Sequence, residues 1–282
     1  MPSILITGCS SGIGYYCAKA LQAEGYQVFA TARQQKDVER LLNEGLQSTR
    51  LDLTDSQSID DALTWLLEQT NGQLDALFNN GAYGQPGAVE DLSRQTLRQQ
   101  FETNLFGTHE LTCKVIKLMR KQGHGRIIQN SSVLGLITMK YRGAYNASKF
   151  ALEGLTDTLR QELSDTPIKV SLIEPGPIES DFRKNAHKAF NANIDIETSA
   201  HKNTYIAVQK RLANTNAKQK NDTFTLGPEA VYNALKHALE SRHPKARYYV
   251  TFPTKLFAVL RRLLSTRGLD WVLNKISNSE NK

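Results

Sequence analysis

The sequence has few cysteines and no long apolar run, and both absences narrow the class of protein. Its three cysteines, Cys9, Cys17 and Cys113, are widely spaced and odd in number, so they provide neither a disulfide framework nor a zinc-type pair. No apolar run reaches the length of about 20 residues that a membrane span requires. A strand-like segment, 3–7, begins almost at the first residue and leaves no room for the basic leader of a signal peptide. We therefore expect a soluble cytoplasmic protein with reduced thiols.

Linkers rich in proline, glycine or serine are also missing, as are internal repeats and low-complexity segments. A chain of 282 residues is long enough for one large domain with a sizeable core. We therefore expect a single domain over residues 1–253, followed by a C-terminal extension over 254–282.

The net charge of +7 is concentrated near the C-terminus. Residues 242–275 contain eight of the 35 basic residues but only one of the 28 acidic residues, Asp270, so the rest of the chain is balanced. Basic amphipathic segments can lie on anionic membranes. The commoner explanation, which we favour, is a helix packed over its own substrate pocket or against a partner subunit. One basic tail without a recognition motif argues against nucleic-acid binding.

Short apolar runs alternate with helical patterns over most of the chain. This alternation predicts βαβ crossovers, and hence a doubly wound, mostly parallel sheet of seven strands with helices on both faces. The polar stretch 181–226 is predicted to be a mobile helical insertion, a substrate lid over the carboxyl edge of the sheet. The predicted strands are 3–7, 27–31, a third that ends at 51–53, 74–78, 126–130, 168–173 and 247–251, and the predicted helices are 15–24, 56–70, 94–121, 145–163 and 228–241.

A glycine-rich turn, Thr7-Gly8-Cys9-Ser10-Ser11-Gly12-Ile13-Gly14, connects the first predicted strand to the first predicted helix. Glycines at such a turn let the backbone approach a pyrophosphate, which then lies at the positive end of the helix. The same residues also fit Gly-x-Ser-x-Gly, the nucleophile elbow of an α/β-hydrolase. Only nine residues precede Ser10, which leaves no room for the upstream strands and oxyanion loop of that fold. The hydrolase is therefore a distant alternative to a dinucleotide site.

The second predicted strand ends in Thr31-Ala32-Arg33, with no acidic residue nearby. Sites for NAD of this kind place an acid at the strand end to bind the ribose hydroxyls. A guanidinium instead suits the 2′-phosphate of NADP, and Ser11 could add a hydroxyl. We therefore expect NADP(H) as the preferred cofactor, with NAD as an alternative. Asp52 is expected to meet the adenine, and Asn80 lies at the end of the fourth strand, where ligands bind in open α/β sheets.

Tyr145 and Lys149 are four residues apart, so on a helix they lie on the same face. A phenol titrates near pH ~10, and a cation within about 4–6 Å lowers that pKa by roughly 1–3 units. Ser132, at the end of the fifth predicted strand, would offer a hydroxyl to the substrate oxygen. A single Tyr-x-x-x-Lys is usually a pair of residues on a helix surface. Here Ser-Val-x-Gly and the glycine-rich turn occur in the same sequence, and the three motifs together indicate a carbonyl reductase or alcohol dehydrogenase. Asn104 inside a predicted helix, with Gly107 one turn later, indicates a local irregularity.

Taken together, these motifs resemble the classical short-chain dehydrogenase/reductase family over about residues 3–251. The run 145–155 is especially similar to estradiol-type hydroxysteroid dehydrogenases and related bacterial aldehyde/ketone reductases. The resemblance implies that Tyr145 is the general acid–base and that Lys149 lowers its pKa and holds the nicotinamide ribose. It further implies that Ser132, rather than Ser131, polarises the carbonyl and that Asn104 holds a water relay to Lys149. Tyr141 is set aside because no lysine follows four residues later.

The resemblance also implies a cofactor site and an assembly. The family pattern Asn-Asn-Ala-Gly appears here as Asn79-Asn80-Gly81-Ala82, a transposition beside the adenine ribose. A homodimer or tetramer through 94–121 and 145–163 is implied. An alternative to the oxidoreductase is a dinucleotide-sensing module without turnover. In such a module we would expect the tyrosine, the lysine or the serine to be replaced. A partly apolar substrate pocket is predicted from Leu134, Leu136, Met139 and Tyr141. The implied cofactor residues are Gly8, Ser11, Gly12, Ile13, Gly14, Arg33, Asp52, Leu53, Asn80, Tyr145 and Lys149, with Pro175, Gly176, Ile178 and Ser180 around the nicotinamide.

Overall fold

The computed structural model describes residues 1–213 and 224–280. Within them, seven parallel strands form one sheet in the order β3-β2-β1-β4-β5-β6-β7. The order reverses between β1 and β4, and in open α/β sheets ligands bind outside the carboxyl ends of the strands at such a point. The strands are β1 (Ser3–Ile6), β2 (Gln27–Ala32), β3 (Gln47–Arg50), β4 (Ala76–Asn79), β5 (Gly125–Asn130), β6 (Ile168–Glu174) and β7 (Arg247–Tyr249).

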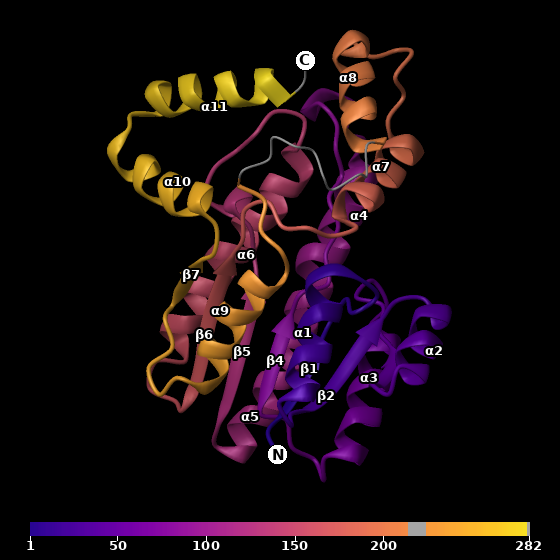
Figure 1. Cartoon of the computed structure of the whole chain (residues 1–282), viewed down its shortest axis with the longest axis vertical. Helices are drawn as coiled ribbons and strands as arrows, with labels where there is room; N and C mark the ends of the chain where they lie inside the picture. The colour runs from indigo at the N-terminus through magenta and orange to yellow at the C-terminus, as the bar shows by residue number, and fades with distance from the viewer. Residues whose placement is uncertain (214–223, 281–282) are drawn as a thin grey trace.

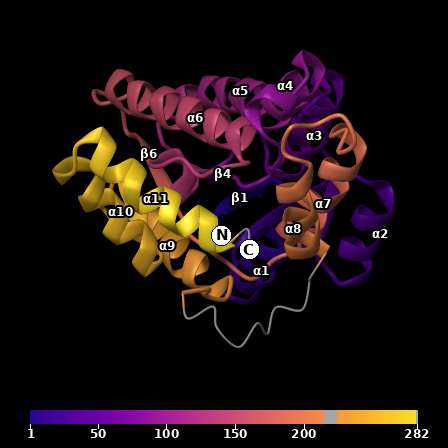
Figure 2. The same cartoon turned by 90° about the horizontal axis from the view of Figure 1, so that it is seen from above.

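Helices cover both faces of the sheet (Figures 1 and 2). The alternation of side chains along β1 places Ile4 and Ile6 in one core, with α1, α2 and α9, and Leu5 in the other, with α3 and α5. The predicted doubly wound fold is therefore confirmed. The helices are α1 (Gly12–Ala23), α2 (Gln35–Asn43), α3 (Ser56–Gln69), α4 (Arg94–Phe101), α5 (Gly107–Gln122), α6 (Gly143–Glu162), α7 (Phe182–Asn193), α8 (Lys202–Ala213), α9 (Glu229–Glu240), α10 (Phe252–Leu263) and α11 (Thr266–Glu280).

The predicted long helix 94–121 is interrupted, as the sequence around Asn104 indicated. A π-helical segment, Glu102–Phe106, separates α4 from α5. At the start of α5 the helix passes so close to the loop after β3 that a Cβ on Gly107 would lie 1.7 Å from the Leu53 carbonyl oxygen. Only glycine permits this approach. The boundary of β3 also differs from the prediction, because the strand ends at Arg50 and leaves Asp52 and Leu53 in the following loop.

Four helices lie beyond the carboxyl ends of the strands (Figure 1). Two of them, α7 and α8, belong to the predicted insertion 181–226, of which 214–223 lies outside the described residues. They pack around Phe190, Tyr205 and Val208. The other two, α10 and α11, form the C-terminal extension, and none of the helices in the described residues is long and apolar enough to cross a bilayer.

Candidate active site

Tyr145 and Lys149 lie in the first two turns of α6, next to the end of β5. Both are buried, with 9% and 3% of their surface exposed. The Lys149 Nζ atom is 5.7 Å from the centroid of the Tyr145 ring and donates a hydrogen bond of 2.7 Å to the Asn130 carbonyl, at the last residue of β5. The strand end therefore fixes the ammonium group beside the phenol, as the four-residue spacing predicted.

The two serines that follow β5 have different surroundings. Ser132 accepts a hydrogen bond of 3.1 Å from the Leu134 amide, and its hydroxyl is close enough to the Tyr145 phenol to lower the pKa of that phenol. The Ser131 side chain is buried and has no hydrogen-bond partner among the described residues. The hydroxyl beside the Tyr145 phenol is therefore that of Ser132; its contact with a substrate oxygen stays a prediction.

Burial dominates the titration of this pair. It raises the pKa of Tyr145 to about 12, and the hydrogen bond from Ser132 lowers that pKa by less. Burial lowers the pKa of Lys149 to about 8, and the nearby Glu153 carboxylate acts in the opposite direction. That Lys149 brings the phenol pKa down stays a prediction, since the net upward shift in the pKa of Tyr145 has burial as its largest cause. At neutral pH the phenol keeps its proton.

Asn104 is buried in the π-helical segment and fastens two parts of the site. Its Oδ1 accepts from the Tyr83 amide at 3.1 Å, and its Nδ2 donates to the Tyr83 carbonyl at 2.9 Å and to the Ser148 hydroxyl at 3.2 Å. The side chain thus ties the loop after β4 to α6, beside Lys149. The water relay to Lys149 stays a prediction.

The glycine-rich turn lies at the switch point, against the segment that follows β4. Gly8 and Gly12 have φ values of 73° and 57°, and a Cβ on Gly8 would lie 2.7 Å from the Gly81 Cα. The Asn80 side chain donates to the Thr7 carbonyl at 3.0 Å and to the Gly8 carbonyl at 3.2 Å. The close approach therefore requires glycine at position 8, whereas a Cβ on Gly81 would lie 3.2 Å from the Thr7 hydroxyl oxygen, a tight contact but not an overlap.

The start of α1 is suited to an anion. Ser11 is the N-cap residue, but its side chain makes no capping hydrogen bond, so the first amides of the helix keep their positive field for a ligand. A Cβ on Gly14 would lie 2.4 Å from the Gly8 carbonyl oxygen, and one on Gly12 would lie 2.8 Å from the Ser180 Cβ. These residues form a cradle of backbone atoms that fits a dinucleotide pyrophosphate.

The segment 175–180 closes the other side of this cradle. The Pro175 carbonyl accepts from the Val133 amide at 2.8 Å, which joins the end of β6 to the segment that carries Ser132. Gly176 lies against Thr251, whose Oγ1 would be 2.2 Å from a Cβ there. Ile178 forms an isolated bridge with Leu226. The predicted nicotinamide residues therefore lie beside both Ser132 and the glycine-rich turn.

Charged residues surround the ends of β2 and β3. Arg33 is exposed, and its charge acts on the nearby Tyr83 phenol. The Asp52 carboxylate accepts from the Thr54 amide and hydroxyl at 3.0 and 2.8 Å and lies 3.7 Å from the Arg50 guanidinium. No motif marked Arg50, whose Nε donates to the Arg33 carbonyl at 3.3 Å and which brings a second guanidinium to this edge.

A third arginine, Arg40, was missed because the sequence analysis did not predict α2. Its guanidinium donates to the Ser10 carbonyl at 2.7 Å and lies 5.2 Å from the Tyr15 ring centroid. The apolar positions Val38 and Leu41, which α2 buries, were the available signal.

Phe182, the first residue of α7, lies over the Tyr145 phenol and was also missed. Its ring packs edge-on against Tyr145, with centroids 5.2 Å apart. A Cβ on Gly84 would lie 2.7 Å from the Phe182 ring, so the glycine leaves room for this contact. Leu134 and Leu136 join Tyr145 in one apolar cluster with Phe257 and Leu273 of the C-terminal helices, and Met139 packs against it.

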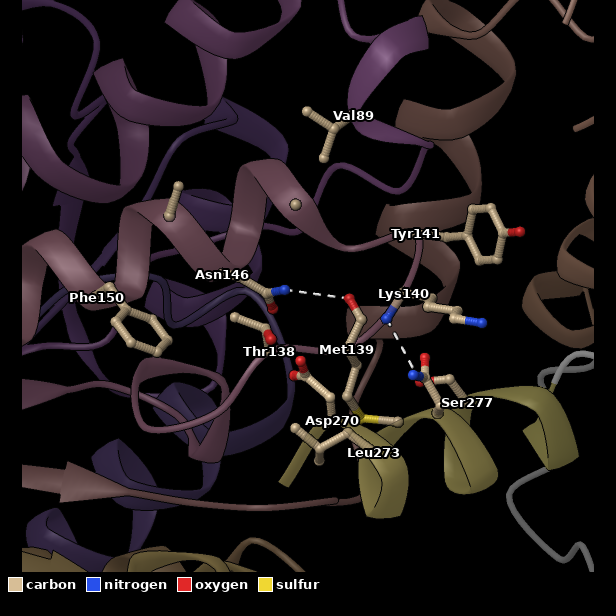
Figure 3. A pocket seen from close by; sticks show the side chains of 13 residues that line it. Val89, Thr138, Met139, Lys140, Tyr141, Asn146, Phe150, Asp270, Leu273 and Ser277 are labelled. Carbon is tan, nitrogen blue, oxygen red and sulfur yellow. Dashed lines mark hydrogen bonds between the residues drawn. The ribbon is translucent and has the colours of Figure 1, made fainter. Parts of the chain in front are cut away.

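Tyr141 departs from the predicted substrate pocket. Its ring contacts His201 and Tyr205 of the insertion, at centroid distances of 5.5 and 6.1 Å, and Figure 3 shows it pointing away from Asn146 and Leu273. The pocket in Figure 3, of about 420 Å³, lies between α6 and α11. Neither Tyr145 nor Lys149 is among the residues that line it, although Asn146 follows Tyr145 directly, so this pocket adjoins the pair without containing it.

Comparison with known proteins gives four informative similarities. A family model described as short chain dehydrogenase matches residues 2–191. The uncharacterized oxidoreductase YbbO of Escherichia coli K12 is 42% identical over 271 residues, which cover 96% of this chain and 93% of the relative. The bovine 17-beta-hydroxysteroid dehydrogenase type 6 is 33% identical over 281 residues, which cover 96% and 87%. A crystal structure of a variant actinorhodin polyketide ketoreductase with NADPH is 26% identical and superposes with a TM-score of 0.69, covering 88% of this chain and 95% of that one.

Proposed function

Because this chain belongs to the short-chain dehydrogenase family of oxidoreductases, we propose that it interconverts a carbonyl compound and the corresponding alcohol with NADP(H). One observation carries the proposal: the Tyr145 phenol is buried between the Ser132 hydroxyl and the Lys149 ammonium group, at the carboxyl edge of the sheet. The ketoreductase of known structure, whose complex contains NADPH, supports the cofactor and the carbonyl substrate.

The proton chemistry follows from the burial of these groups. A reduced nicotinamide supplies hydride to the carbonyl carbon when it is bound. Tyr145, with a pKa of about 12, holds its proton at neutral pH and donates it to the carbonyl oxygen as that oxygen gains charge. The Ser132 hydroxyl donates a hydrogen bond to the same oxygen, and the charge of Lys149 stabilises the phenolate that remains.

The preference for NADP rests on the charges beside the adenosine end of the cradle. Arg33 and Arg50 bring two guanidinium groups to the ends of β2 and β3, and such groups suit a 2′-phosphate. Asp52 is turned toward Thr54 and Arg50. We expect Arg33→Ala to raise the KM for NADPH roughly tenfold or more, the loss of one charge-assisted contact, and to leave the KM for NADH unchanged. An equal effect on both cofactors would contradict the preference.

The central test is Tyr145→Phe, measured as NADPH oxidation across a panel of aldehydes and ketones. Turnover should fall by orders of magnitude, while NADPH binding, followed by calorimetry, is retained. Tyr141→Phe is the matched control, because it removes a neighbouring phenol that faces the insertion, and its turnover should remain near that of the unmodified protein. Near-normal turnover in Tyr145→Phe would reject the role of the phenol. NADPH binding by the unmodified protein without turnover of any carbonyl would favour a sensing module.

The substrate is proposed to be partly apolar. Tyr145 shares its cluster with Leu134, Leu136 and Phe257, and Phe182 covers its ring. The bovine relative is named for a hydroxysteroid substrate, and a substrate of that kind agrees with the apolar cluster around Tyr145. A series of ketones of increasing apolar size, compared by kcat/KM, tests the proposal; a preference for small polar carbonyls would contradict it.

A further inference from the structure

Helix α10 has two apolar faces, and among the described residues only one of them is buried. At the start of the other face, the Phe252 ring stacks on Phe224 with centroids 5.7 Å apart. Phe257 and Ala258 are buried in the cluster that contains Tyr145, which agrees with a helix packed over its own site. On the other side, Phe252, Leu256, Val259 and Leu263 are 61%, 40%, 53% and 75% exposed. Their spacing of four, three and four residues puts them in one line along the helix. We refer to these four residues as the α10 stripe.

Positive charge borders the α10 stripe. Lys255 and Arg262 are exposed on α10 and, by helical spacing, lie along one side of the stripe. Lys255 also lines a pocket of about 480 Å³ together with Lys245, which is exposed as well. No acidic residue occurs between Glu240 and Asp270 in the sequence. We refer to Lys245, Lys255 and Arg262 as the basic flank.

We propose that the α10 stripe and the basic flank dock this protein onto the surface of an anionic lipid bilayer. An exposed apolar line enters the boundary between headgroups and acyl chains, and adjacent lysines and arginines bind the anionic headgroups. One headgroup phosphate would bind beside the stripe, in the pocket that Lys245 and Lys255 line. Because α10 lies beyond the carboxyl ends of the strands (Figure 1), docking brings the proposed active site near apolar molecules dissolved in the lipid.

A second copy of the chain fits this surface less well. In a symmetric dimer through the stripe, the twofold axis would place each basic flank against the opposite side of the partner's stripe. Because α10 contains no acidic residue, the basic flank would lose solvent there without gaining an opposite charge. An anionic bilayer supplies the opposite charge along the whole patch. Charge complementarity therefore selects the lipid surface.

Vesicle flotation of the full chain tests the proposal, and it needs no turnover, so its outcome is independent of the proposed enzyme activity. We expect binding to vesicles of equimolar phosphatidylglycerol and phosphatidylcholine and none to phosphatidylcholine alone. Binding should be lost at an ionic strength of about 1 M, where the Debye length falls to about 3 Å. Lys255→Gln with Arg262→Gln should weaken binding roughly 30-fold, given the contribution of each cation near an anionic surface.

Leu263→Gln should weaken vesicle binding at least roughly tenfold, because the variant lacks the leucine side chain whose transfer out of water favours binding. Two controls match these changes: Lys36→Gln with Lys121→Gln removes the same charge elsewhere on the surface, and Leu42→Gln replaces a leucine of α2 that is 49% exposed. Unchanged thermal unfolding shows that the α10 variants are folded. Failure to bind anionic vesicles at low ionic strength, or equal losses in the controls, would overturn the proposal. Self-association in sedimentation velocity that Leu263→Gln abolishes would assign the stripe to a second copy.

Discussion

Glu153 lies one turn after Lys149 on α6 and should set the pH range in which that lysine is charged. It is 6% exposed, and its carboxylate pairs with Arg247 of β7, which also pairs with Asp157 and Glu174. Glu174 is fully buried, and burial together with Glu153 raises its pKa to about 8. Burial and Glu153 therefore both favour the protonated form of Glu174, and Arg160, which pairs with Asp157, adds a further positive charge to the group.

Replacement of Glu153 by glutamine removes the carboxylate that keeps Lys149 protonated. The pKa of Lys149 is about 8 with that carboxylate in place, and loss of an adjacent opposite charge lowers such a pKa by roughly 1 unit or more. One unit corresponds to about 1.4 kcal/mol. If Lys149 acts as a cation, kcat/KM for carbonyl reduction falls as it loses its proton. The alkaline limb of that pH profile should therefore move from about 8 to about 7.

The other charged groups around Glu153 supply the controls. Asp157→Asn also removes one carboxylate from Arg247 but leaves Glu153 beside Lys149, so the limb should stay near its original pH. Glu174→Gln removes the other group whose pKa is about 8 and should likewise leave the limb in place. Arg160, which pairs with Asp157, and Tyr249, which lies near Arg247, are unchanged in all three variants. An unmoved limb in Glu153→Gln, or the same displacement in Asp157→Asn, would refute this role of Glu153.

Two further predictions concern packing. Gly107→Ala should lower the free energy of unfolding in urea by about 1–3 kcal/mol, because its Cβ would overlap the Leu53 carbonyl. Gly154→Ala, on α6 with nothing within 4 Å of the new methyl group, should instead raise the free energy of unfolding by up to about 1 kcal/mol. Equal effects would contradict the close approach at Gly107. Phe182→Ala should widen the space over Tyr145 and raise kcat/KM for bulky ketones relative to small ones severalfold; an unchanged ratio would show that this ring does not limit substrate size.

Much of the fold could be predicted because its signals are local. The alternation that places Ile4 and Leu5 in different cores is visible in the sequence, and so is the order of strands and helices that implies a parallel sheet. The spacing of Tyr145 and Lys149 and the glycines of the first turn need no knowledge of distant residues. The homo-oligomer, the cytoplasmic location and the mobility of the insertion stay predictions.

The missed residues act through contacts between distant parts of the chain. Arg40 reaches Ser10 from a helix whose short apolar pattern was not recognised. Arg247 meets Glu153 and Glu174 only because β7 lies next to β6 and under α6. Phe182 opens a polar insertion and carries no motif, yet it covers the phenol. Spacing along the chain contains no information about such encounters.

The sequence by itself determined which elements form and which chemical groups are available: a cradle for an anion, a phenol, a hydroxyl and an ammonium group in a fixed order. Those properties depend on side-chain periodicity and on residue type, which are local. The tertiary structure decided how those groups titrate, because the pKa values of Tyr145 and Lys149 follow from burial rather than from their spacing. It also decided which face of α10 is covered and which remains in contact with solvent, since solvation is a property of the folded whole.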